Sequence, residues 1–300
     1  MKLFRERTSI SQAIALMAIM AAINIIVSVI AAFSIVASVC LIIILPLTST
    51  IVVLTCPEKY FPIYAVATIG LSLVATIWNI DVTLFYVVPS IVSGFVFGFC
   101  MKKSIYFGWS IIVATILQTA ISFAIIPLIN VMFEIDFISD LLGIFKIYDA
   151  IPGQIFLCVS FFLVALIQTL LSFFVVRNEI FKMYGDLQTS NGYKHFCFLG
   201  VCFSLCVAPV AFLSIGAAYV LELLATIIAG FVIYELFRSK ANKRLIASVA
   251  ILFANVFLVA IFYDLIPSYC GLMIFTLTPL IICLLSFCYF LLKKEHNNIK

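Results

Sequence analysis

The sequence predicts an all-α protein, a polytopic bundle of about ten transmembrane helices with both termini in the cytoplasm. Three observations carry this prediction: an apolar composition, ten long apolar runs and a one-sided distribution of basic residues. The chain has 300 residues, of which 66% are hydrophobic and 10% are charged. A soluble domain carries about 25% charged residues. So few charges cannot cover a surface that faces water, and we expect the chain to lie in a lipid bilayer.

The apolar runs have the length that a membrane-spanning helix needs, about 20 residues. They cover residues 10–32, 35–55, 62–80, 82–100, 105–131, 154–176, 197–214, 217–237, 245–263 and 271–292. The first run continues directly into the second without a small-residue cleavage site, so we interpret it as a span and not as a signal peptide. The divisions at 32–35, 80–82 and 214–217 are short. A kinked or re-entrant segment at one of them would merge two spans, which leaves eight spans as the alternative.

Basic residues give the orientation, because cytoplasmic loops are enriched in Lys and Arg. With the amino terminus inside and every run crossing once, 16 of the 17 Lys and Arg residues lie on the inner side, and Lys146 lies outside. Losing a single span would reverse every later loop, so the number of spans is even. The same inner bias and the lack of a targeting segment favour a bacterial plasma membrane.

Two of the segments between apolar runs have sequence patterns that predict a structure or a division of the chain. The outer segment 133–153 predicts a short amphipathic helix that Pro152 and Gly153 would end; it is either a connector or a lid over an outward-facing cavity. Its polar side holds Asp136, Ser139, Asp140 and Gly143, and its apolar side holds Phe137, Leu141, Ile144 and Phe145.

The inner segment 178–196 is the most polar stretch and contains a Ser-Asn-Gly turn signal. It divides the chain into a six-span part, 1–177, and a four-span part with a short basic tail, 197–300.

Motifs for catalysis are absent from the sequence: it has no P-loop, no H-E-x-x-H and no G-x-S-x-G. We therefore expect no enzyme, no ATPase of the P-loop type, no cofactor and no metal site. The ten cysteines lie mostly in apolar runs, where Cys is a small apolar residue. Basic residues are spread over short loops, which argues against nucleic-acid binding.

Polar residues within the apolar runs are the candidates for substrate binding, since an ionisable residue in a span is a functional hypothesis by default. Glu222 is the clear ionisable case, although it is near enough to the outer end of its run to reach water. Uncharged polar residues in spans usually serve packing, and a few could line a pocket. The candidates for substrate contact are Asn24, Gln118, Asn130, Gln168 and Glu222.

Two faces of small residues stand out. Ser11, Ala15, Ala18 and Ala22 share one side of the first span, and Gly94-x-x-x-Gly98 lies in the fourth. Such faces let helices approach closely, either within this bundle or against another membrane protein. Asn24 and Ser28 lie on a different side of the first span, which we expect to face the interior of the protein.

These features together resemble the S component, the substrate-capture subunit of energy-coupling-factor vitamin transporters. The resemblance rests on Ala18-x-x-x-Ala22, LPLTST at 45–50, Gly94 and Gly98 in a span that ends in Lys102-Lys103, and a sixth span with a basic end. It implies that the front part captures a small molecule, that the alanine face docks onto a transmembrane coupling subunit, and that two ATPases power the cycle.

An S component ends after six spans, so the last four spans do not fit that family. The full length resembles the YybS-like bacterial membrane family, which joins an S-component-like front to extra C-terminal spans and whose biochemical role is not established. The stretch FVIYELFRSKANKRLI at 231–246 is compatible with that back part.

Two functions remain open at this point. The first is a transport subunit that binds a small molecule and needs an ATPase partner. The alternative is a membrane scaffold that recruits cell-envelope or division proteins. A membrane enzyme built around Glu222 is disfavoured, because no base, nucleophile or metal ligand accompanies this carboxylate.

Overall fold

The computed structural model describes residues 9–184, 192–238, 242–262 and 275–288, and these ranges contain helices and turns but no strand. The predicted all-α fold is confirmed. Six of the described helices are long and apolar enough to cross a membrane, so we treat the chain as an integral membrane protein. These helices are Ile10–Phe33, Ile77–Lys102, Phe107–Phe133, Ala150–Met183, Tyr193–Ala211 and Ile215–Phe237.

Each of the ten apolar runs contains a helix. The order along the chain is α1 (Ile10–Phe33), α2 (Ile35–Thr55), α3 (Phe61–Ala75), α4 (Ile80–Val82), α5 (Val88–Lys102), α6 (Phe107–Phe133), α7 (Phe137–Ile144), α8 (Ala150–Tyr184), α9 (Tyr193–Ala211), α10 (Ile215–Arg238) and α11 (Asn242–Phe262). The last run contains the helix Phe275–Cys288. Short 3-10 segments lie at Glu58–Tyr60 (η1) and Ile77–Asn79 (η2), and a π-helical segment, η3, covers Thr83–Val87.

The three short divisions in the sequence each separate two helices. Ser34 is extended between α1 and α2, and residues 212–214 separate α9 from α10. The middle division lies earlier than the sequence indicated: α3 stops at Ala75, and Asp81 already belongs to α4.

The segment after α6 differs from the prediction at its end. The amphipathic helix α7 stops at Ile144, whereas Pro152 and Gly153 lie in the first turn of α8 and do not end a helix. Proline is compatible with a first turn, because the backbone N–H that it lacks has no partner within the helix there.

The predicted inner loop is also shorter than expected. α8 continues to Tyr184 and α9 begins at Tyr193, so residues 178–184 and 193–196 are helical; residues 185–191 lie outside the described ranges. Polar residues suit a helix that continues beyond an apolar run. Glu179 and Lys182, three residues apart, form an ion pair on this extension of α8.

The chain forms two compact units. Unit 1 contains residues 1–146 and 161–191, and unit 2 contains residues 147–160 and 192–300. This division does not coincide with the predicted one at 178–196, because the first turns of α8 belong with the C-terminal helices. Gln154 Nε2 donates to Ser214 Oγ at 2.9 Å, and a Cβ on Gly216 would lie 2.9 Å from the Cys158 sulfur.

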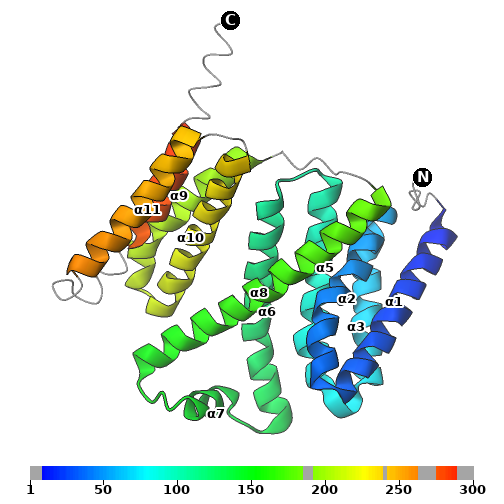
Figure 1. Ribbon diagram of the computed structural model, residues 1–300. Helices are drawn as coiled ribbons and strands as arrows, with labels where there is room; N and C mark the ends of the chain where they lie inside the picture. Colours follow the sequence, from blue (N-terminus) through cyan, green and yellow to red (C-terminus); the bar gives the residue numbers. More distant parts are fainter. Residues whose placement is uncertain (1–8, 185–191, 239–241, 263–274, 289–300) are drawn as a thin grey trace, which may run out of the picture. The chain divides into compact units, whose positions relative to one another are not determined.

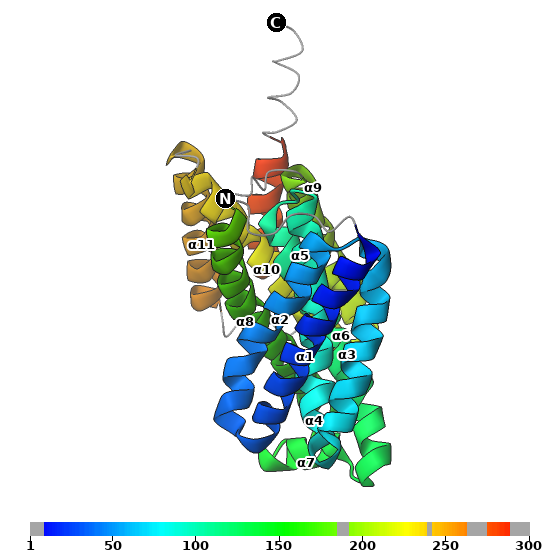
Figure 2. The same cartoon turned by 90° about the vertical axis from the view of Figure 1, so that its right-hand side faces the viewer.

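In unit 1, α1 packs against α2 and α3, α2 packs against α5, and α5 packs against α6; Figures 1 and 2 show α1, α2 and α3 side by side. The unit 1 part of α8 runs antiparallel to α6. Along this pair, the Phe123 ring lies 5.2 Å from that of Phe161, and the Arg177 guanidinium lies over the Phe107 ring. α7 lies across the end of α6 (Figure 1).

The contact between α2 and α5 depends on two glycines. A Cβ on Gly94 would lie 2.5 Å from the Pro46 carbonyl oxygen, and one on Gly98 would lie 2.7 Å from the Val53 Cβ. Thr50 Oγ1, from the same stretch of α2, lies 3.1 Å from the Gly94 carbonyl oxygen and donates to it. The bare glycine backbone therefore lets α2 and α5 approach until their backbones are in contact.

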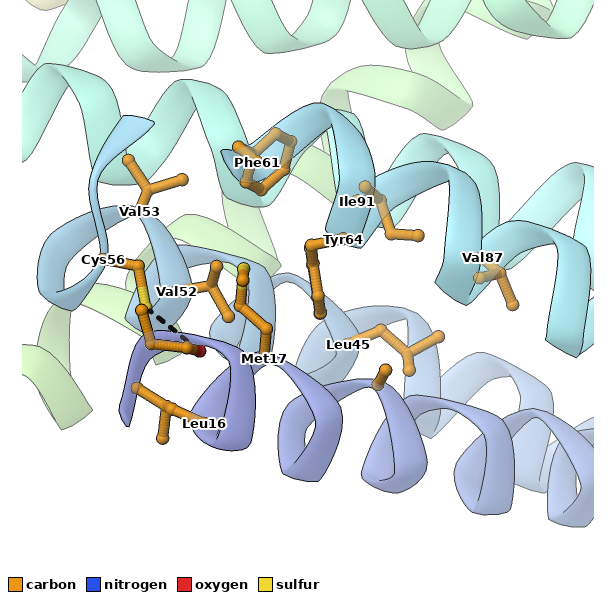
Figure 3. Packing of buried hydrophobic residues seen from close by; sticks show 12 residues of the cluster. Leu16, Met17, Leu45, Val52, Val53, Cys56, Phe61, Tyr64, Val87 and Ile91 are labelled. Atoms are coloured by element: carbon orange, nitrogen blue, oxygen red, sulfur yellow. Dashed lines mark hydrogen bonds between the residues drawn. The ribbon is translucent and has the colours of Figure 1, made fainter. Parts of the chain in front are cut away.

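An apolar cluster fills the space among α1, α2, α3 and α5, and Figure 3 shows it from close by. Its members include Leu16, Met17, Leu45, Val52, Phe61 and Ile91. Tyr64 is the one strongly polar side chain in this group and stands between Phe61 and Leu45 (Figure 3).

Unit 2 is organised around the pair α9 and α10, which pack along their length, with α11 beside α10. Val207 and Ala218 form the centre of their contact. Gly200 gives the helix Phe275–Cys288 room to approach α9, because a Cβ there would lie 2.6 Å from the Cys283 sulfur.

Candidate functional site

A line of buried polar side chains passes through the apolar interior of unit 1, and we call it the polar seam. All of its members are at most 7% exposed. They come from α1, α2, α3 and the broken segment that follows α3. The members are Asn24, Ser28, Thr48, Ser49, Tyr64, Thr68, Ser72, Thr76 and Thr83.

The α3 part of the seam follows directly from residue spacing. Tyr64, Thr68, Ser72 and Thr76 recur every fourth residue, so they form one stripe along one side of the helix. Thr68 donates to the Tyr64 carbonyl oxygen at 2.7 Å, and Thr76 donates to the Ser72 carbonyl oxygen at 2.9 Å. These bonds use the hydroxyl protons of Thr68 and Thr76 on carbonyl oxygens one turn earlier, and each hydroxyl oxygen keeps its lone pairs as acceptors.

Asn24 joins three helices at the centre of the seam. Its Nδ2 donates to the Tyr64 hydroxyl on α3 at 2.9 Å, and its Oδ1 accepts from Thr48 Oγ1 on α2 at 2.7 Å. Ser28 donates to the Asn24 carbonyl oxygen one turn away. The expectation that Asn24 and Ser28 face the interior of the protein is confirmed.

The seam ends at a break in the helical structure. After α3, the chain passes through η2, the single turn α4 and the π-helical segment η3 before α5 begins. η3 contacts α1, α2, α3 and α6, and Thr83 within it is fully buried. Thr83 Oγ1 lies 2.7 Å from Thr76 Oγ1. π-helical turns are rare and are frequent at functional sites.

Gln118 is the centre of a second polar group in unit 1. Its Nε2 donates to Ser93 Oγ on α5 at 2.7 Å, and its Oε1 accepts from Thr169 Oγ1 on α8 at 2.9 Å. Gln118 therefore links α5, α6 and α8, and both ends of its amide group are engaged by neighbouring side chains.

Among the described residues of unit 1, the buried hydroxyls without a hydrogen-bond partner include Ser72 Oγ, Ser90 Oγ and Thr115 Oγ1. A polar group without a partner in a dry interior costs about 1–3 kcal/mol. Each of these hydroxyls could bind a polar ligand, a water molecule or an ion.

The remaining predicted contacts lie elsewhere. Asn130 is half-buried at the far end of α6, where its Oδ1 accepts from the backbone N–H of Phe137 at the start of α7. Gln168 is half-buried on α8. Asn130 thus connects α6 to α7 and takes no part in the seam or in the Gln118 group.

Glu222 belongs to unit 2 and is 8% exposed on α10. Its Oε1 accepts from Thr226 Oγ1 at 3.3 Å, while its Oε2 has no hydrogen-bond partner. The structure therefore gives no basis for placing Glu222 in one site with Asn24 and Gln118.

The two small-residue faces have opposite surroundings. Ala15, Ala18 and Ala22 are exposed on α1, whereas Gly94 and Gly98 are buried against α2. α2 covers the face of the two glycines in unit 1, so their close approach is made within the protein, and the predicted docking role of Gly94 and Gly98 stays a prediction. The alanine face stays open.

α7 starts with a cap. The backbone N–H and the hydroxyl of Ser139 both donate to the Asp136 carboxylate. These hydrogen bonds lower the pKa of Asp136, which is fully exposed to solvent. Ile144 and Phe145, which were predicted for an apolar side, are also exposed.

The chemistry of the seam is that of neutral hydrogen bonding. Hydroxyls, one amide group and backbone carbonyls supply it, and the seam holds no charged side chain. Within the described ranges, no three His, Cys, Asp or Glu residues come together as a metal site.

Sequence reasoning found Asn24 and Ser28 but missed the rest of the seam. The signal was present: four hydroxyl-bearing residues recur at a spacing of four in 64–76. This spacing does not by itself indicate a site, because Ser and Thr are common in membrane helices, where the hydroxyl donates to the carbonyl oxygen four residues earlier. The stripe differs from such ordinary Ser and Thr residues in its hydrogen bonds to other segments, between Tyr64 and Asn24 of α1 and between Thr76 and Thr83 of η3.

The fold and the buried polar groups define the class of the protein, an all-helical integral membrane protein. Comparison with known proteins adds no family to this class: no protein-family model, no curated protein and no solved structure matches the chain.

Proposed function

We propose that the chain is the solute-binding subunit of a membrane transport system and that the polar seam is its binding site. The observation that supports this most is the seam itself, which places nine polar side chains inside an apolar helix bundle. Polar groups in such an interior are unfavourable unless they are paired or used. Their neutral character suits a small, uncharged polar solute or an ion that can bind neutral oxygens.

The proposed membrane arrangement has ten spans and both termini in the cytoplasm. Contacts in unit 1 support it, since segments assigned to one side meet one another. On the inner side, Lys102 lies 3.4 Å from Glu58. On the outer side, Asn79 Nδ2 donates to the Ala32 carbonyl oxygen at 3.1 Å, and the Phe85 and Phe137 rings are neighbours.

The alanine face of α1 is the proposed docking surface for a transmembrane coupling subunit that works with ATPases. Ala15, Ala18 and Ala22 are exposed side by side, and a partner helix can approach such a face closely. Asn24 lies on the opposite side of the same helix. Docking on one side of α1 would therefore act directly on a helix that contributes to the seam.

The test is a purification from native membranes in mild detergent, with ATP hydrolysis measured in the purified material. Ala18→Leu/Ala22→Leu should remove the co-purifying ATPase and a membrane-embedded coupling subunit. Ala67→Leu is the matched control, because Ala67 is an exposed alanine on α3 outside the proposed docking face, and it should retain both partners.

The opposite result would remove the transport proposal. If no ATPase co-purifies with the unaltered protein, and the double variant behaves like Ala67→Leu, the alanine face contacts lipid only. A reproducible crosslink from 177–196 to a cell-envelope or division protein would then favour the scaffold.

A further inference from the structure

We propose that the broken helix at the end of the polar seam is a binding site for an alkali-metal cation, with the hydroxyls of Ser72, Thr76 and Thr83 as ligands. Sodium is the ion that we expect there. The three ligands lie at one end of the polar seam, so this proposal rests on the binding site proposed above. Its test is separate from the transport test, because ion binding is measured on the purified chain without a solute or an ATPase.

The contact between Thr76 and Thr83 leaves oxygen lone pairs free for an ion. A hydroxyl has one proton and two lone pairs. Thr76 uses its proton on the Ser72 carbonyl oxygen. In the contact of 2.7 Å between Thr76 and Thr83, Thr83 is therefore the donor. Thr83 Oγ1 keeps both of its lone pairs, and Thr76 Oγ1 keeps one.

Ser72 adds a hydroxyl without a partner to the same stripe. Its side chain is fully buried, and its Oγ has no hydrogen-bond partner. Ser72 lies one turn before Thr76 on the same side of α3, so its oxygen belongs to the same stripe as the Thr76–Thr83 pair. An ion that reaches Ser72 Oγ would give this buried hydroxyl a partner.

The backbone at the end of α3 also favours a cation. α3 ends at Ala75, and the C-terminal end of a helix carries a partial negative charge, although the Ser72 carbonyl oxygen already accepts from the backbone N–H and the hydroxyl of Thr76. A cation is favoured at such an end. Interrupted membrane helices whose carbonyls and C-terminal ends bind Na⁺ are a known solution to ion binding inside a bilayer.

The ligand set selects the type of ion. Hard cations prefer oxygen ligands, and Ca²⁺ and Mg²⁺ sites in proteins normally include carboxylates. None of the three ligands here is a carboxylate, which favours a monovalent ion. Asp81 is half-buried in the first turn of α4, two residues before Thr83 along the chain.

The experiment measures sodium binding by the full chain in detergent. Thermal unfolding is followed in increasing NaCl and, at matched ionic strength, in choline chloride, and bound ²²Na⁺ is counted by equilibrium dialysis. We expect the unfolding midpoint to rise with NaCl alone and one ion to bind per chain. Ligand binding to the folded state raises stability in this way.

Three variants locate the site. Thr83→Val removes the oxygen and keeps the shape, and it should weaken sodium binding about tenfold or more. Thr83→Ser restores the oxygen and should restore binding. Thr55→Val is the matched control, because it removes a buried hydroxyl of unit 1 that lies outside the seam and already donates to the Ile51 carbonyl oxygen within α2; binding should persist.

Two results would overturn the proposal. One is the absence of bound ²²Na⁺ from the unaltered protein. This result rejects the ion site without any variant, so it holds even where a variant does not fold. The other is equal sodium binding by Thr83→Val and the unaltered chain, which would mean that any ion binds elsewhere. Neither result bears on the ATPase co-purification that tests the transport function.

Discussion

The alanine face of α1 and the glycine face of α5 carry the same sequence pattern, two small residues four apart, and they end in opposite environments. Gly94 and Gly98 are covered by α2, whose backbone touches them, whereas Ala18 and Ala22 remain exposed. Two small residues four apart thus indicate that another helix can approach closely, but they do not identify which helix it is. Glycine permits contact between backbones, and in unit 1 that contact is already made.

The largest effect is expected where the face is covered. Gly94→Ala places a Cβ 2.5 Å from the Pro46 carbonyl oxygen and from Ser49 Cβ. Overpacking of this kind costs about 1–3 kcal/mol, so the free energy of unfolding in mixed micelles should fall by that amount. Gly70→Ala is the control on α3, since no atom lies within 4 Å of the added Cβ. Equal losses at Gly94 and Gly70 would contradict the close contact of α2 with α5.

A smaller effect is expected on the inner side of α1. Asn24→Leu removes the hydrogen bonds to Tyr64 and Thr48 and leaves both hydroxyls in an apolar interior. Interhelical hydrogen bonds in membranes contribute about 0.6 kcal/mol on average and about 1.7 kcal/mol at most. Unfolding of the purified variant should show a loss in this range. A stability equal to that of the unaltered chain would mean that the network contributes nothing to the fold.

The exposed side of α1 should tolerate substitution. Ala18→Leu/Ala22→Leu adds side chains that meet no neighbour in unit 1, so we expect the free energy of unfolding to change by less than about 0.5 kcal/mol. A loss as large as that of Gly94→Ala would show that this face packs within the protein and is not a docking surface.

The most local effect concerns the start of α7. The hydrogen bonds from Ser139 favour the ionised form of Asp136 and lower its pKa. The cap is therefore present above the ordinary Asp pKa of about 3.9 and is lost as the pH falls through the lower pKa of the folded state. Hydrogen exchange at the Ser139 amide, corrected for its intrinsic pH dependence, should lose protection in that acidic range.

In Asp136→Ala, the Ser139 amide should exchange its hydrogen at every pH as quickly as it does in the unaltered chain at acidic pH, after correction for the intrinsic pH dependence. The rest of α7 and the seam should not respond, because the cap is exposed and involves only Asp136 and Ser139. A protection profile that is flat through the acidic range in the unaltered chain would show that the carboxylate does not hold the turn.

The helices were predictable from the sequence to a much larger extent than the polar seam was. Each of the ten apolar runs contains a described helix, since a bilayer-spanning helix needs about 20 apolar residues. The extension of α8 to Tyr184 and its start at Ala150 were missed, because polar residues and an early proline are compatible with a helix as well as with a loop. Asn24 was recognised as interior, whereas the α3 stripe and its partner Thr83 were not.

By itself, the sequence determined that this is a helical membrane protein, where its helices lie, and that Ala15, Ala18 and Ala22 share a face apart from Asn24. These are consequences of composition and of helical period, which are local properties. The tertiary structure decided which small-residue face is covered, that Asn24 meets Tyr64 and Thr48, and that Thr76 meets Thr83 across a break in the helices. Such contacts depend on how each helix is rotated about its axis, and in a bilayer packing between neighbouring helices sets that rotation.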